Sequence, residues 1–115
     1  MTEHTIAYLG PRGTFTEEAV NLLKPRKSMA VGSVAEALDL VVEKKADRAV
    51  IPVENSIEGS VSATSDALAN IPGIQIYSEN LIAVRFVLAS KGAKLENIQR
   101  VLTHPVAYAQ ARKWL

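Results

Sequence analysis

The chain has 115 residues, of which 48% are hydrophobic, so it is long and apolar enough for one packed domain and does not have the composition of a disordered protein. Its formal net charge is +1, and because its Lys and Arg residues are dispersed, the sequence indicates neither a nucleic-acid partner nor binding to a membrane surface. It has no cysteine and two histidines that lie far apart, which argues against a disulfide framework, a thiolate nucleophile or a metal site, and with no export signal or membrane-spanning stretch we expect a cytoplasmic protein.

The first predicted unit is a short strand followed by a helix. Residues 5–9 are apolar enough for a buried strand, and the turn Gly10-Pro11-Arg12-Gly13 ends it. Residues 14–17, Thr-Phe-Thr-Glu, have the form of a capping box, so a helix should start at Thr14 and end before Pro25. The apolar stripe of this helix would be Phe15, Ala19, Leu22 and Leu23. The turn lacks the lysine of a P-loop and the third glycine of a dinucleotide fingerprint, which argues against ATP or NAD.

The same pattern of strand, turn and helix then repeats. Residues 29–31 predict a second strand, and residues 33–36, Ser-Val-Ala-Glu, form a second capping box. The apolar stripe of the following helix would be Val34, Leu38, Val41 and Val42. Residues 48–53 supply a third strand. Strands that alternate with helices predict an α/β fold with a parallel sheet and right-handed crossovers.

The candidate ligand loop is residues 52–61, Pro-Val-Glu-Asn-Ser-Ile-Glu-Gly-Ser-Val, at the end of the third strand. Strand ends in open α/β sheets leave a crevice, and a following helix directs backbone N–H groups into it, so an anion would be favoured there. Asn55 and Ser56 add neutral hydrogen-bonding groups, and Gly59 permits a close approach of the backbone. A capped turn without a ligand uses the same residue types, and this alternative stays open. The next helix is expected over residues 61–70, with a packing face of Ala63, Ala67 and Leu68.

The last third of the chain predicts more strand and one helix. Residues 74–90 are rich in Ile, Val, Leu and Phe, which favours one or two strands, and residues 101–103 predict another. His104-Pro105 should start a helix, because proline suits the first helical position. The apolar stripe of this helix would be Ala107, Ala111, Trp114 and Leu115. Because no stop signal follows, we expect the complete protein to continue beyond this point.

Three turns at the ends of predicted strands carry a resemblance to a known family. Residues 10–16, residues 52–61 and residues 103–110 stand in the order and spacing of motifs in the prephenate dehydratase family, which the sequence resembles along essentially its whole length. The resemblance implies a two-lobed α/β fold like the type II periplasmic binding proteins, with parallel or mixed sheets and flanking helices. It also implies a carbon–oxygen lyase that converts prephenate, held between the lobes, to phenylpyruvate, water and carbon dioxide in L-phenylalanine biosynthesis.

The same resemblance implies a division of the chain. Residues 1–75 would form the first lobe, residues 76–90 crossing strands or a hinge, and residues 91–115 the start of the second lobe. The family's Thr-Arg-Phe motif, whose threonine is taken as the catalytic group, has no counterpart here, and the regulatory ACT-type domain is also absent. We therefore expect an N-terminal fragment that is inactive alone, and a full-length protein that forms a dimer or tetramer.

The site residues that the resemblance implies come from all three turns. The catalytic candidates are Asn55, Thr103 and Gln110, and the substrate-binding candidates are Gly13, Thr14, Phe15, Asn55, Ser56, Gly59, Thr103, His104 and Gln110. Neither a cofactor nor a metal is expected, since aromatisation drives the loss of carbon dioxide. Backbone N–H groups at helix starts after Gly13, Ser56 and Thr103 could bind the two carboxylates of prephenate. The third turn departs from the family pattern Ser-His-Pro-Gln-Ala-Leu-x-Gln-Cys at Thr103, Val106, Tyr108 and Ala111.

Several of these candidates have simpler explanations. Thr14 would cap a helix in any case, Phe15 lies on an apolar stripe, and His104 before a proline fits a turn. Two other functions stay open for the full-length protein. One is a dehydratase of the same family that acts on arogenate, and the other is a non-catalytic two-lobed module that binds an amino acid or a similar solute. Each of these has a small-molecule ligand and no nucleic-acid or membrane partner.

Overall fold

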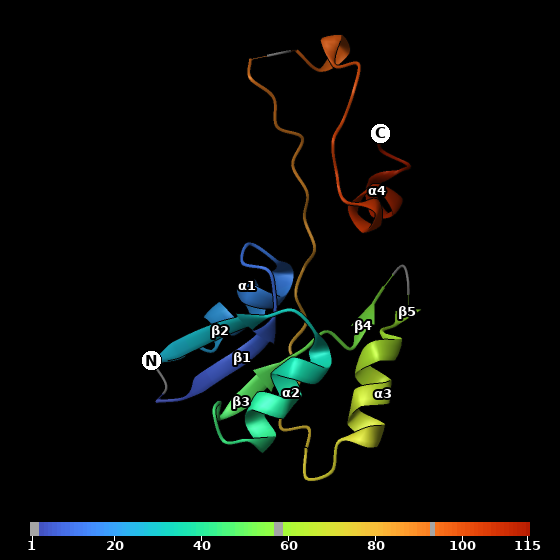
Figure 1. Ribbon diagram of the computed structural model, residues 1–115. Coiled ribbons are helices and arrows are strands. Elements are labelled where there is room, and N and C mark those ends of the chain that lie inside the picture. Colours follow the sequence, from blue (N-terminus) through green and yellow to red (C-terminus); the bar gives the residue numbers. More distant parts are fainter. Residues whose placement is uncertain (1–2, 57–58, 93) are drawn as a thin grey trace. The chain divides into compact units, whose positions relative to one another are not determined.

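The computed structural model describes residues 3–56, 59–92 and 94–115, and the chain divides into two compact units, Met1–Ile82 and Ala83–Leu115 (Figure 1). The first unit contains a parallel sheet of three strands, in the order β2-β1-β3. The strands are β1 (Thr5–Leu9), β2 (Lys27–Val31) and β3 (Arg48–Val50), and the helices between them are α1 (Phe15–Leu22) and α2 (Val34–Val42). The predicted α/β unit with a parallel sheet is therefore confirmed. Strand β2 starts at Lys27 rather than at residue 29, and β3 ends at Val50 rather than at residue 53.

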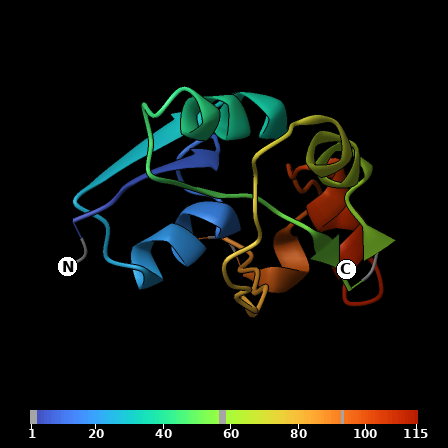
Figure 2. The ribbon, with the colours of Figure 1, turned by 90° about the horizontal axis from the view of Figure 1, so that it is seen from below.

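Strand β1 lies at the centre of the sheet and carries most of the core. Residues 5–8 of this strand are all buried, because a strand flanks β1 on each side and a helix covers each face. Figure 2 shows α1 and α2 on opposite faces of the sheet. Since successive side chains of a strand point to opposite faces, β1 contributes to two clusters. The cluster on the α1 face consists of Ile6, Tyr8 and Val20, and the cluster on the α2 face consists of Ala7, Ala37 and Ala46.

Both predicted helix caps are confirmed. At α1, Thr14 Oγ1 accepts a 3.3 Å hydrogen bond from the backbone N–H of Glu17, and at α2, Ser33 Oγ accepts one of 3.1 Å from the N–H of Glu36. The glutamate of a capping box usually reaches back to the N–H of the capping residue itself. Here both glutamates instead accept from the glycine one position earlier, so each cap extends into the loop that precedes its helix.

In α1 and α2, two positions on the predicted apolar stripes are wrong. Leu22 is 62% exposed and Val42 is 49% exposed. Both residues end their helices, and the adjacent residues on the same predicted stripes do contact the core. Leu23, the C-cap of α1, packs against the first cluster, and Val41 packs against the second. The apolar stripes are thus correct in phase, with one exposed position near the end of each, Leu22 in the first and Val42 in the second.

The polar stretch after β3 forms an antiparallel hairpin instead of running straight into a helix. The elements of this region are β4 (Glu54–Asn55), β5 (Gly59–Ser60) and α3 (Ser62–Asn70). The predicted face of α3 is partly wrong, because Ala63 is exposed and Thr64 is buried in its place, next to the correctly predicted Ala67. Helix α3 packs against α2 through a cluster that consists of Val34, Leu38 and Ala67.

The second unit contains a short 3₁₀ helix, η1 (Leu95–Asn97), and α4 (Pro105–Ala111). The strands predicted over residues 74–90 and 101–103 are wrong, because the described residues of these segments pair with no strand. A strand needs a neighbour to satisfy its backbone groups, and an apolar run cannot supply that neighbour by itself. From residue 83 on, no described residue is buried, and Val87 is 91% exposed. Across the described ranges, the helices are all too short or too polar to span a bilayer.

Candidate functional site

The first candidate loop, residues 10–14, leaves the carboxyl end of β1. The N–H of Gly10 donates a 2.9 Å hydrogen bond to the carbonyl of Val31, at the end of β2. A Cβ atom on Gly10 would lie 3.1 Å from the Cβ of Ala30 and 3.2 Å from the Val31 carbonyl oxygen, so a side chain does not fit there without a shift. Gly13 has a φ of +84°, which favours glycine. The loop is therefore fixed to β2 at its start and to the cap of α1 at Thr14.

Glu17 ties the end of this loop to the sheet. Its Oε1 accepts a 2.8 Å hydrogen bond from the hydroxyl of Tyr8, and its Oε2 accepts one of 2.6 Å from the N–H of Gly13. The Gly13 N–H, followed by the Tyr8 hydroxyl, lowers the pKa of Glu17, whereas burial and then the Glu17 contact raise the pKa of Tyr8. Arg12 also favours the ionised carboxylate. At neutral pH the pair is therefore a neutral phenol that donates to a carboxylate.

Sequence reasoning placed Glu17 in a capping box and missed its role in the loop. The available signal was the box itself, since Thr14 and Glu17 are three positions apart. The partner Tyr8 lies nine residues before Glu17 and on a strand, so no helical spacing relates the two. The position of the tyrosine depends on the packing of α1 against β1, which the sequence does not state.

The second candidate loop is the β4–β5 hairpin. Asn55 is half-buried and pairs with Gly59 across the ladder, and Ser56 is exposed. Gly59 has a φ of +80°, a backbone conformation that favours glycine. Ile57 and Glu58, which belong to the predicted motif, lie outside the described residues. The helix predicted over residues 61–70 is confirmed as α3, but the β4–β5 hairpin separates its start from Ser56, so the N–H groups of that helix do not directly follow Ser56 as expected.

The two loops leave the same edge of the sheet. Strand β1 pairs in parallel with β3, with Tyr8 opposite Val50, so their carboxyl ends are neighbours (Figure 1). Loop 10–14 follows β1 directly, and the hairpin follows β3 after residues 51–53. In open α/β sheets this edge is where ligands bind. The topology thus brings two groups of predicted site residues to one edge, and these are Gly13, Thr14, Phe15, Asn55, Ser56 and Gly59.

The remaining predicted site residues, Thr103, His104 and Gln110, belong to the second unit. His104 is the N-cap of α4, and its Nδ1 accepts a 3.2 Å hydrogen bond from the N–H of Val106. Pro105 occupies the first helical position, as predicted. Thr103 is exposed and Gln110 is half-buried. The structure therefore gives His104 a structural role as a cap and places the three residues at and along one short helix.

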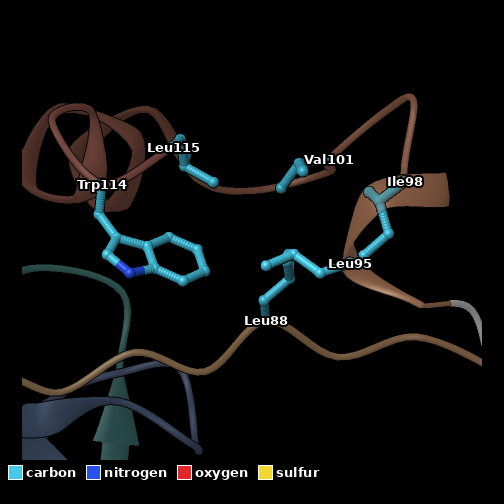
Figure 3. Close-up of a pocket in the computed structure, with 6 residues that line it drawn as sticks. All are labelled: Leu88, Leu95, Ile98, Val101, Trp114 and Leu115. Carbon is cyan, nitrogen blue, oxygen red and sulfur yellow. The ribbon is translucent and has the colours of Figure 1, made fainter.

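The second unit also has an open apolar hollow of about 370 Å³ (Figure 3). It is lined by Leu88, Leu95, Ile98, Val101, Trp114 and Leu115. Trp114 is 66% exposed, and apart from its indole N–H the lining side chains are apolar, so the hollow offers little that could orient an anion. Thr103 instead lines a neighbouring hollow of about 440 Å³, together with polar side chains such as Arg112.

Charged side chains are few at the candidate loops of the first unit. Arg12 and Glu54 are exposed, and Glu17 is engaged with Tyr8 and Gly13. Within residues 3–56, 59–92 and 94–115, no three His, Asp or Glu side chains lie close enough to share a metal ion. The described residues of these loops can therefore offer a ligand the exposed Arg12 guanidinium, besides hydrogen bonding by neutral hydroxyl, amide and backbone groups.

Comparison with known proteins gives one consistent result. The family model for prephenate dehydratase matches residues 6–115. The prephenate dehydratase of Mycolicibacterium vanbaalenii is 39% identical over 96% of this chain and 41% of its own length, and that of Amycolatopsis methanolica is 42% identical over 96% of this chain and 36% of its own length. The crystal structure of prephenate dehydratase from Arthrobacter aurescens in complex with L-Phe has a TM-score of 0.82 and 41% identity, and the match covers 96% of this chain and 37% of that one. The chain thus spans about two fifths of the length of these relatives.

Proposed function

This chain belongs to the prephenate dehydratase family, and on that premise we propose that the full-length protein converts prephenate to phenylpyruvate, water and carbon dioxide. The observation that carries the proposal is the family match over residues 6–115. The arrangement of the first unit agrees with it, because two loops with hydrogen-bonding groups leave the same carboxyl edge of a parallel sheet, the edge at which ligands bind in such folds.

We further propose that the chain contributes to a two-lobed fold of the type II periplasmic-binding-protein kind. Residues 1–75 would belong to the first lobe, residues 76–90 to the crossing segment and residues 91–115 to the second lobe. The division of the chain into two compact units supports a two-part arrangement. So does the sheet of the first unit, which has a helix on each face.

The reaction makes two demands that these residues could meet. Prephenate is a dianion, and its ring hydroxyl must leave with developing negative charge while carbon dioxide is lost. Asn55, Thr103 and Gln110 are the proposed catalytic groups, because their amides and hydroxyl can donate to the departing oxygen. Proposed contacts to the rest of the substrate come from Thr14, Phe15, Ser56, Gly59 and His104. The N–H of Gly13 already donates to Glu17. We therefore propose that Gly13 shapes the loop through its positive φ and does not bind a carboxylate of the substrate directly.

The test is to supply the full-length protein with prephenate and with arogenate in parallel. Release of phenylpyruvate from prephenate would support the proposal, and release of phenylalanine from arogenate alone would assign the arogenate reaction instead. Binding of either compound without turnover would favour the non-catalytic binding module. The same assay with added L-Phe would test whether this protein also binds the amino acid found in its Arthrobacter relative.

A further inference from the structure

We propose that Glu17 is a positioning residue, which holds the loop of residues 10–14 in the geometry that the substrate requires. The inference rests on the proposed dehydratase function for its kinetic readout. Its structural basis is that the two oxygens of one carboxylate have different partners. Oε1 accepts from the Tyr8 hydroxyl on the central strand, and Oε2 accepts from the Gly13 N–H in the loop.

The strand end of this connection is fixed. Tyr8 is fully buried in the strand that has neighbours on both sides, so its hydroxyl has little freedom to follow a moving partner. A buried hydroxyl must keep a hydrogen bond, and a carboxylate is a stronger acceptor than a neutral group. Tyr8 therefore fixes the position of Glu17 Oε1. Because the carboxylate is planar and rigid, the position of Oε2, which binds Gly13, is restricted as well.

The loop end of the connection determines where Thr14 lies. Thr14 stands directly after Gly13 and caps the N–H of Glu17 with a bond of 3.3 Å. The bond from Gly13 to the Glu17 carboxylate is shorter, at 2.6 Å, and it acts on the residue whose positive φ sets the direction of the loop. Without the carboxylate, the long capping bond alone would hold Thr14, a proposed substrate contact, in place.

The chain contains its own control for this argument. Glu36 accepts a 2.9 Å hydrogen bond from the N–H of Gly32, in the same position relative to α2 as Glu17 has relative to α1. Glu36 is exposed, and the loop that it holds contains none of the predicted site residues. The Glu36→Ala variant therefore removes the same kind of glutamate–glycine bond at a helix start as Glu17→Ala does, but it leaves the hydrogen bond between Tyr8 and Glu17 in place.

The experiment compares the full-length wild type with Glu17→Ala, Glu17→Gln and Glu36→Ala. Steady-state turnover of prephenate gives KM and kcat, and hydrogen–deuterium exchange reports on the backbone amides of residues 10–14. For Glu17→Ala we expect faster exchange in the loop and a KM raised about tenfold or more, with kcat changed less than about threefold. Glutamine can accept from Gly13 and donate to the Tyr8 oxygen, so Glu17→Gln should restore KM to within about threefold of the wild type. Glu36→Ala should stay within about twofold.

Two results would overturn the inference. One is unchanged loop exchange in Glu17→Ala, which would show that the carboxylate does not hold the loop, whether or not the protein acts on prephenate. The other is an equal rise in KM for Glu17→Ala and Glu36→Ala, which would reduce the effect to helix capping. If the wild type fails to turn over prephenate, the proposed function fails, and the exchange measurement still decides whether Glu17 holds the loop.

Discussion

The hydroxyl of Thr64, which is 1% exposed, donates a 2.5 Å hydrogen bond to the carbonyl of Pro52, twelve residues earlier in the chain. Pro52 lies between the end of β3 and the start of the β4–β5 hairpin. The bond therefore anchors the beginning of a candidate ligand loop to helix α3. It also explains why a polar residue occupies a position on α3 that faces the core.

The replacement Thr64→Val should destabilise the protein by about 1 to 2 kcal/mol. Valine keeps the shape of threonine but leaves the Pro52 carbonyl without its donor, and an unpaired polar group in a partly buried place costs about that much. Thr64→Ser retains the hydroxyl and serves as the matched control. Urea unfolding of the three proteins measures the difference, and equal midpoints for wild type and Thr64→Val would show that the bond contributes nothing.

The Tyr8–Glu17 contact should make stability depend on pH in acid. The Gly13 N–H, the Tyr8 hydroxyl and the Arg12 guanidinium all lower the pKa of Glu17 below its ordinary value of 4.5. A carboxyl whose pKa is lowered by folding stabilises the protein above its unfolded pKa, and this contribution is lost as the pH falls through the folded pKa. Thermal melts between pH 2 and 7 should therefore show a steeper acid loss for the wild type than for Glu17→Gln. Parallel curves for the two proteins would contradict the expectation.

A side chain at Gly10 should be destabilising by about 1 to 3 kcal/mol, because the added Cβ would press on backbone and on a neighbouring strand. In Gly10→Ala the new atom would lie 3.2 Å from the Val31 carbonyl oxygen and 3.1 Å from the Ala30 Cβ. Gly32→Ala is the control, since its Cβ would meet only the end of the Glu36 side chain at 3.6 Å, with a φ open to alanine. Chemical denaturation of the wild type and both variants measures the free energy of unfolding. A similar loss of stability in Gly10→Ala and Gly32→Ala would contradict the prediction.

Asn55→Ala in the full-length protein should lower turnover rather than unfold it. Loss of one hydrogen-bond donor to developing charge raises a barrier by about 2 to 4 kcal/mol. Asn55 is half-buried on a two-residue strand, so its truncation removes little core packing. Assays of kcat for prephenate, with circular dichroism to check the fold, test this prediction. Turnover within about twofold of the wild type would remove Asn55 from the proposed catalytic groups.

The fold of the first unit was predictable because its signals are local. The apolar strand at residues 5–9 and the caps at Thr14 and Ser33 each depend on a few neighbouring residues, and all three are present in the structure. The strands expected over residues 74–90 failed because pairing requires a partner from elsewhere, which no apolar run can specify. The hairpin was missed because each of its strands is only two residues long, which is too short for an alternating pattern, whereas the helix expected after it is present as α3.

The candidate site was predictable in its residue types and less so in its connections. Parallel topology alone implies that loops after β1 and β3 share an edge, and the structure has that topology. The bonds from Tyr8 to Glu17 and from Thr64 to Pro52 depend on how helices pack, so they could not be read from spacing. The roles assigned to Thr103, His104 and Gln110 as substrate contacts stay predictions.

Where α2 packs on β1, the buried residues of the cluster are all alanines, namely Ala7 on β1, Ala37 on α2 and Ala46 in the segment before β3. Such short side chains let the helix backbone approach the strand closely and leave it little room to tilt or slide. The packing of α2 on β1 is therefore expected to stay unchanged when a ligand binds at the carboxyl edge of the sheet. Adjustment to a ligand would then fall to the β4–β5 hairpin, because hydrogen bonds at Gly10, Gly13 and Thr14 hold the loop of residues 10–14.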